Sequence, residues 1–282
     1  MNPRDPHSSR GRNEVEDLSA GVFWAIATRE EPAMKAFRFL EAVAAPLGLV
    51  TVAAMLPADW ELLLLDLPGR GRHHADAPLT DMADAIAFAT AAVVAVADAP
   101  LALFGHSLGG ILAAEVGRAC QARGVAPLWV GISGRIAPAL QAQAPVFSAL
   151  DDDTLLDELV ALGGTAARVC ADPALRAHLL RVVRGDLALL DSYQPAPTRA
   201  PLACPVTAFA GVDDVWAPPH AMRPWLRDTT GALRTRRYPG HHFFFLGDAF
   251  AGFCRDVVDE IARVAPAPAG AAAAASAAGA AA

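Results

Sequence analysis

Cysteine is scarce in this chain of 282 residues, which contains only four. A disulfide framework is typical of small secreted domains with many closely spaced cysteines, so the sequence excludes one here. Histidine and cysteine also never occur together with the spacing of metal ligands. We therefore expect neither a disulfide scaffold nor a metal or redox cofactor.

Long apolar runs are also missing, although 54% of the residues are apolar. A membrane-spanning helix needs about 20 consecutive apolar residues, and no stretch rich in leucine, isoleucine, valine or phenylalanine approaches that length. The first twenty residues are polar and lack the apolar stretch of a secretory signal. The sequence therefore predicts a cytoplasmic protein that does not associate with membranes.

An excess of basic residues is absent as well, because lysine occurs once, at Lys35, and the net charge is -7. This acidic balance argues against nucleic acid as a partner. The high apolar fraction and the charged fraction of 19% exclude a mostly disordered chain.

Composition divides the chain into three regions. Residues 1–20 form a polar arm, and residues 265–282 form a low-complexity tail of alanine, proline and glycine. We expect the arm, which has no apolar stretch, to be disordered, and the tail has no bulky side chain that could pack in a core. We expect one folded domain between them, at residues 21–264.

Within this domain, strand-like apolar segments alternate with helix-like segments. We expect strands at 22–27, 60–69, 101–106, 127–134, 205–211 and 233–239, and helices at 81–98, 107–124 and 247–264. This alternation predicts an α/β fold with a mostly parallel sheet flanked by helices. Residues 136–200 interrupt the alternation with helical spacing alone, which indicates a helical insertion between two strands.

The strongest local motif is Gly105-His106-Ser107-Leu108-Gly109, which follows a predicted strand and opens a predicted helix. This is the context of a nucleophile elbow, in which a serine on a tight strand-to-helix turn exposes its hydroxyl. The amides at the start of the helix point toward a developing oxyanion. We therefore predict Ser107 as the nucleophile and the amide of Leu108 as one oxyanion donor.

A serine nucleophile needs a base, and the base needs an acid that orients it. In hydrolases with this elbow, the acid and then the base follow the serine along the chain. The expected positions are doubled here, since Asp213-Asp214 follow one strand and His241-His242 follow the next. From the residues alone, both pairs stay open. His106 points to the opposite face of its strand from Ser107, so we expect it to be a packing residue.

Seven segments between about residues 58 and 255 resemble the type II thioesterases of polyketide and nonribosomal peptide biosynthesis, which have the α/β-hydrolase fold. The segments are LDLPGRGRH (65–73), FGHSLGG (104–110), SGRIAP (133–138), DDDTLLDELVALGGT (151–165), RGDLALLDSY (184–193), CPVTAFAGVDD (204–214) and YPGHHFFFL (238–246). Elbow motifs occur in many hydrolases, whereas the PGRGR loop and the LGGT segment are much more specific.

The resemblance implies roles for particular residues. The family's G-x-x-D acid segment falls on Asp214, and its G-x-H-F base segment falls on His242, with Asp213 and His241 as the alternatives. Residues 136–200 would form a helical lid over the acyl chain. The substrate would be an acyl thioester on the phosphopantetheine arm of an acyl or peptidyl carrier protein, and the enzyme would be a monomer without a cofactor.

One loop departs from the family pattern. The family carries Phe-Pro-x-Ala-Gly-Gly after its first strand, and that loop supplies the second oxyanion amide. Here the segment 24–32 reads WAIATREEP, in which only Ala27 matches and the glycine pair is missing. The resemblance therefore points to Ala27 as the second donor, and the altered loop leaves room for a slower or changed site.

Two other functions remain open at this point. The same residues would serve an esterase that cleaves oxygen esters, and the altered loop would suit a non-hydrolytic acyl-binding protein. In the PGRGR loop, Arg70 and Arg72 would either meet an acidic carrier protein or form salt bridges within the loop. The leucines of the insertion would either line an acyl tunnel or only pack the lid.

Overall fold

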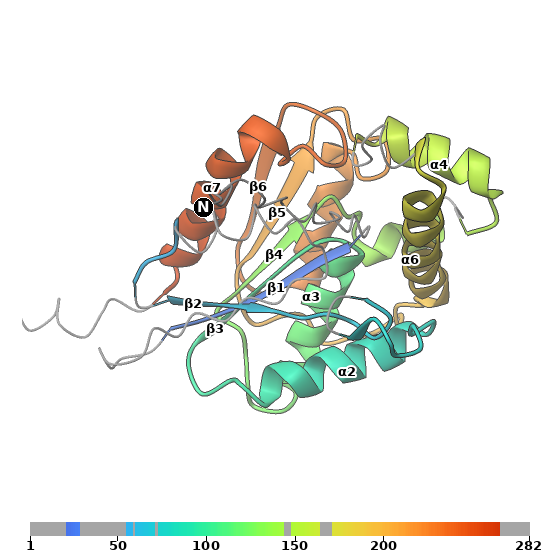
Figure 1. Cartoon of the computed structure of the whole chain (residues 1–282). Helices are drawn as coiled ribbons and strands as arrows, with labels where there is room; N and C mark the ends of the chain where they lie inside the picture. The colour runs from blue at the N-terminus through green and yellow to red at the C-terminus, as the bar shows by residue number, and fades with distance from the viewer. Residues whose placement is uncertain are drawn as a thin grey trace, which may run out of the picture.

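A six-stranded sheet with the order β2-β1-β3-β4-β5-β6 forms the centre of the structure, a computed structural model (Figure 1). The structure describes residues 21–28, 55–58, 60–70, 73–143, 148–163 and 171–265. The predicted arm and the tail beyond residue 265 lie outside these ranges. The strands are β1 (Gly21–Thr28), β2 (Trp60–Leu64), β3 (Leu101–Ser107), β4 (Trp129–Ser133), β5 (Val206–Gly211) and β6 (Leu233–Tyr238).

Strand direction decides which ends of the strands meet. The strands β3, β4, β5 and β6 are parallel, whereas β1 is antiparallel to both of its neighbours, β2 and β3. Since two reversals cancel, β2 points the same way as β3. The prediction of a mostly parallel sheet is confirmed with β1 as the exception, and the carboxyl ends of the other five strands share one edge.

Helices cover both faces of this sheet (Figure 1). The alternation of side chains along β3 explains why, because Leu101 and Leu103 pack into one apolar cluster and Phe104 packs into another. The first cluster holds α2 (Met82–Val94) and α3 (Leu108–Gln121), and the second holds α7 (Phe250–Ala262). In the described part of the chain, no helix combines the length and apolar character needed to cross a bilayer.

Between β4 and β5 the named elements of the described chain are helices: η2 (Pro138–Gln143), α4 (Asp152–Ala161) and α6 (Pro173–Ser192). The side chains of Asp151 and Asp172 accept backbone N–H groups and cap the starts of α4 and α6. Buried leucines and valines join these two helices in one apolar cluster. All three helices fall within the predicted insertion at 136–200, whose function as a lid stays a prediction.

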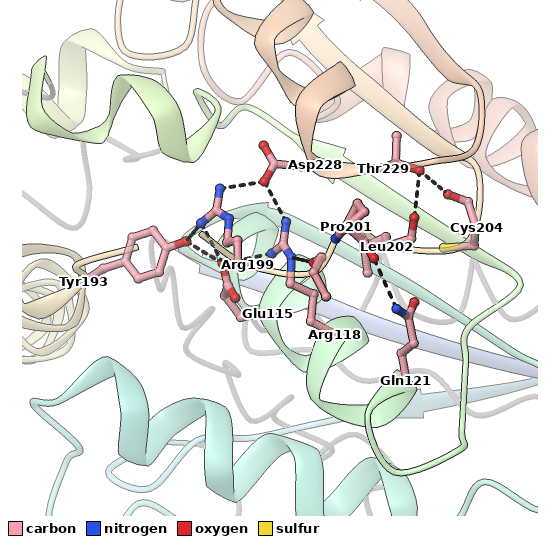
Figure 2. Close-up of polar contacts among 11 residues, drawn as sticks. Glu115, Arg118, Gln121, Tyr193, Arg199, Pro201, Leu202, Cys204, Asp228 and Thr229 are labelled. Carbon is pink, nitrogen blue, oxygen red and sulfur yellow. Dashed lines mark hydrogen bonds and ion pairs between the residues drawn. The ribbon is translucent and has the colours of Figure 1, made fainter. Parts of the chain in front are cut away.

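A polar cluster fastens the end of this insertion to α3 (Figure 2). The hydroxyl of Tyr193, at the end of α6, donates to Glu115 Oε1 at 2.5 Å and accepts from Arg199 Nη1 at 3.1 Å. Arg118 donates to Glu115 Oε1 at 2.9 Å, and Arg118 and Arg199 both donate to Asp228 Oδ1, at 2.7 and 2.5 Å. Two arginines and two carboxylates therefore balance one another in a partly buried site.

Asp228 lies in η3 (Pro219–Asp228) and accepts from two arginines, so its removal leaves two cations without that partner. We expect Asp228→Ala to lower the free energy of unfolding by about 3 kcal/mol, as measured by denaturant titration. The exposed Asp213 provides the control, since Asp213→Ala should cost less than about 0.5 kcal/mol. Equal losses in the two variants would contradict a stabilising role for the cluster.

Candidate active site

The turn between β3 and α3 holds Ser107 in a strained backbone conformation. Its φ of 53° and ψ of -117° make it the one non-glycine residue with a positive φ in the described ranges. Such conformations are costly and concentrate at functional sites. The observed geometry is that of a strand-to-helix elbow with the serine at its apex, as the motif predicts.

The elbow brings two backbone segments so close together that one position tolerates only glycine. A Cβ atom on Gly105 would lie 1.9 Å from the carbonyl oxygen of Gly109. Any larger residue would push the start of α3 away from β3 and displace Ser107. The two glycines that frame the serine therefore set the shape of the turn.

Leu108 is the first residue of α3, so its amide belongs to the first turn, where N–H groups have no partner within the helix. That amide directly follows the serine and is available to an oxyanion. The expected second donor, Ala27, does not lie next to the nucleophile. Ala27 pairs with Leu101, whereas Gly21 pairs with Ser107.

The prediction for Ala27 is wrong because it requires β1 to run parallel to β3. In the antiparallel arrangement, the end of β1 lies at the opposite edge of the sheet from the elbow. Leu101 and Ser107 are six residues apart on β3, which corresponds to about 20 Å at ~3.3 Å per residue. Among the residues that the structure describes, Leu108 is the predicted oxyanion donor that lies at the nucleophile.

The acid position is occupied by Asp214, which follows β5. Its Oδ1 accepts the backbone N–H groups of Trp216 at 2.9 Å and Ala217 at 3.0 Å. Its Oδ2 lies 2.9 Å from Nδ1 of His242, and both side chains are buried. The carboxylate is therefore held by two amides and directed at one imidazole nitrogen.

Burial distinguishes the two neighbouring aspartates from each other, and likewise the two neighbouring histidines. Asp213 and His241 are exposed, and Nδ1 of His241 lies 3.2 Å from the backbone carbonyl oxygen of Asp213 instead of from a carboxylate. The structure thus joins Asp214 to His242, the pair that the resemblance favours. Nε2 of His242 is buried and has no hydrogen-bond partner within the described ranges, which leaves it available for proton transfer.

The loops after β3, β5 and β6 meet at the same edge of the sheet. His106, next to the nucleophile, has its ring centroid 4.6 Å from that of His242. The His242 ring also contacts Trp216 and Phe243, with centroids 5.6 and 5.2 Å away. The predicted nucleophile, base and acid are therefore brought to one buried, largely aromatic place.

Arg70, in the loop after β2, behaves as neither of the two alternatives predicted for it. It is buried and forms an ion pair with Asp186, in the middle of α6, so it is unavailable to a carrier protein. Arg181, also in α6, donates to the carbonyl oxygen of Gly69 at 3.3 Å. The loop therefore fastens the helical insertion instead of closing on itself; Arg72 lies outside the described residues.

The sequence prediction passed over the contacts that His106, Ser133 and Gly134 make beside the base. His106 is buried as predicted, but its neighbours include His242 and the hydroxyl of Ser133, 3.0 Å from its Nδ1. A signal for these contacts was present in the sequence, because the SGRIAP segment begins at the last residue of β4, and β4 lies next to β3. Parallel neighbouring strands bring their ends together.

The sheet order, the helices on both faces and the elbow at the end of β3 define the α/β-hydrolase fold. Residues 42–260 match the family described as the thioesterase domain. The chain therefore belongs to the thioesterase-domain family, whose members are hydrolases that act on thioester bonds.

Curated relatives include a biosynthesis protein and a thioesterase from two bacteria. The chain is 31% identical over 189 residues to the gramicidin S biosynthesis protein GrsT of Aneurinibacillus migulanus, covering 67% of this chain and 73% of that protein. It is 39% identical over 169 residues to the thioesterase PikA5 of Streptomyces venezuelae, covering 59% of each chain.

Solved structures that are similar to this chain are also thioesterases. The RedJ thioesterase from the prodiginine pathway of Streptomyces coelicolor has a TM-score of 0.70 and 29% identity, covering 77% of this chain and 86% of that one. The type II thioesterase BorB from the borrelidin cluster has a TM-score of 0.68 and 29% identity, covering 87% of this chain and 100% of that one. The resemblance to type II thioesterases is confirmed.

The close approach of the backbone at Gly105 predicts that a larger residue there would destabilise the protein. We expect Gly105→Ala to lower the free energy of unfolding by about 3 kcal/mol or more and to abolish activity, because its Cβ would overlap the Gly109 carbonyl. The control is Gly185→Ala in α6, whose Cβ would meet only Pro78 at 3.9 Å. That change should stabilise by about 0.5–1 kcal/mol, since alanine favours helix. Thermal unfolding of both variants checks the contrast, and a stable, active Gly105→Ala would refute it.

Proposed function

We propose that this enzyme hydrolyses acyl thioesters held on the phosphopantetheine arm of an acyl or peptidyl carrier protein, with Ser107, His242 and Asp214 as its triad. The observation that carries the proposal is the buried bond of 2.9 Å between Asp214 and His242, at the edge of the sheet where β3 ends on a serine in a strained elbow. The names of the relatives, which include biosynthesis proteins for gramicidin S and borrelidin, support a carrier-bound substrate.

Acyl transfer begins at the serine. Nε2 of His242 takes the hydroxyl proton as Ser107 Oγ attacks the thioester carbonyl, and a tetrahedral oxyanion forms. Asp214 holds Nδ1 of His242, which fixes the tautomer and stabilises the imidazolium. The amide of Leu108 donates to the oxyanion.

The tetrahedral intermediate then collapses. The C–S bond breaks, the pantetheine sulfur leaves as a thiol with the proton from His242, and the acyl group remains on Ser107. Water attacks the acyl-serine while His242 takes one of its protons. The second collapse returns that proton to Ser107 Oγ and releases a carboxylic acid.

The apolar surroundings of the base support an apolar acyl chain. Trp216 and Phe243 each contact the His242 ring, and both also pack against the leucine cluster of α4 and α6. Most leucines of the insertion are buried in that cluster, so they pack α4 on α6 instead of lining an open channel. We propose that Trp216 and Phe243 form the boundary between the substrate and the helical insertion.

Intact-protein mass spectrometry tests the nucleophile. We expect the wild type to unload an acyl carrier protein, and Ser107→Ala to leave it loaded, because no other described side chain lies at the elbow apex. A matched oxygen ester on the same acyl group should react more slowly. A preference for the oxygen ester would favour an esterase, and a carrier that stays loaded with wild-type enzyme would refute hydrolysis.

The two neighbouring aspartates provide a matched pair for the acid. We expect Asp214→Asn to lower kcat by on the order of a hundredfold or more, because an amide cannot hold the imidazole in the required tautomer. Asp213→Asn should keep kcat within about twofold, since that side chain is exposed. Steady-state hydrolysis of an acyl thioester measures both. The reverse ranking would move the acid to Asp213.

A further inference from the structure

Two buried imidazoles lie in contact beside the nucleophile. His106 is 1% exposed and His242 is 2% exposed, and their ring centroids are 4.6 Å apart with planes inclined by 54°. Aromatic pairs interact at centroid distances of roughly 4.5–7 Å, so the two rings touch. The mechanism above uses only one of them.

Other contacts hold the His106 ring in place. Ser133 Oγ lies 3.0 Å from His106 Nδ1, and the Phe245 ring centroid lies 4.8 Å from that of His106. Gly134 has a φ of +57°, and a Cβ there would lie 2.4 Å from Cε1 of His106 and 3.2 Å from Cε1 of His242. The backbone after β4 therefore borders both imidazoles, and only glycine leaves room for them.

A histidine is an expensive choice for a position that only fills the core. Nε2 of His106 is buried without a hydrogen-bond partner among the described residues, and an apolar ring would avoid that cost. Burial lowers the pKa of His106 well below its ordinary value, and the nearby His242 lowers it further. The ring is therefore neutral and adds no positive charge beside the base.

The hydrogen bond to Asp214 does not by itself fix the plane of the His242 ring. A single hydrogen bond at Nδ1 fixes one atom of the His242 ring, whereas the torsion that sets the ring plane has a broad minimum. The orientation of Nε2 toward the serine depends on that plane. Rings packed against the imidazole restrain that plane, and His106 has the shortest centroid distance of the three described rings that contact it, ahead of Phe243 and Trp216.

We propose that His106 is a positioning residue for the base: its imidazole, anchored by Ser133, sets the plane of the His242 ring so that Nε2 meets Ser107. This inference rests on the proposed function and extends it, because it assigns a task to the second histidine. Gly134 takes part by giving both rings the space to lie in contact.

The rate of Ser107 phosphonylation by a fluorophosphonate tests the proposal on the full chain without assuming a thioester substrate. The serine oxygen forms a bond to phosphorus, fluoride leaves, and His242 accepts the hydroxyl proton. We expect His106→Ala to slow labelling at least tenfold, and Ser133→Ala, which keeps both rings, to slow it about threefold. With an acyl-carrier thioester, kcat should fall by similar factors while KM stays within twofold.

Phe104→Leu is the matched control, since Phe104 lies on the same strand and the same face but packs against Trp129, Phe209 and Phe253, away from the base. We expect it to lower Tm without slowing labelling more than twofold. His106→Phe, which restores a ring, should label faster than His106→Ala.

Several results would overturn the assignment. One is a folded His106→Ala variant that is labelled at a rate within twofold of wild type. Another is a Phe104→Leu variant that loses as much Tm as His106→Ala and whose labelling is slowed as much as that of His106→Ala. If wild type labels normally but leaves acyl carriers loaded, the thioester proposal fails while the role of His106 can still be confirmed. If wild type does not label at all, both fail.

Discussion

The buried hydrogen bond between Asp214 and His242 is the interaction on which the candidate site depends. It joins the loop after β5 to the loop after β6, and it exists because these parallel strands end at the same edge of the sheet. A buried carboxylate is costly unless it is well partnered. Two backbone amides and one imidazole supply those partners, so the fold holds the carboxylate against the candidate base.

The need to partner buried polar groups also governs how the helical insertion is attached to the rest of the fold. Arg70 reaches Asp186 in the middle of α6, and Tyr193 at its end joins the cluster around Glu115. Each connection pairs a buried or half-buried charge with a partner from a distant part of the chain. Between them, apolar side chains pack α4 on α6 and meet the two aromatic residues that contact the base. The insertion is therefore connected to the edge of the sheet that carries the candidate site by polar and by apolar contacts.

Much of this architecture follows from local patterns. Every strand except β2 lies within two residues of its predicted segment, because the apolar runs are short and are bounded by turn residues. The elbow was predictable because glycine, serine and glycine at fixed spacing between strand and helix have a steric purpose that Gly105 demonstrates. The β2 strand ends at Leu64 instead of residue 69, since Pro68 and Gly69 belong to the turn that presents Arg70.

The sequence by itself determined the chain order of the candidate nucleophile, acid and base, and the strand ends on which they lie, because these depend on local turns and on alternating elements. Only the tertiary structure decided the direction of β1, which removed Ala27 from the site, and the partner of Arg70. It also brought His106 against His242. These are contacts between distant segments, set by strand pairing and by the need to partner buried polar groups, and no local pattern encodes them.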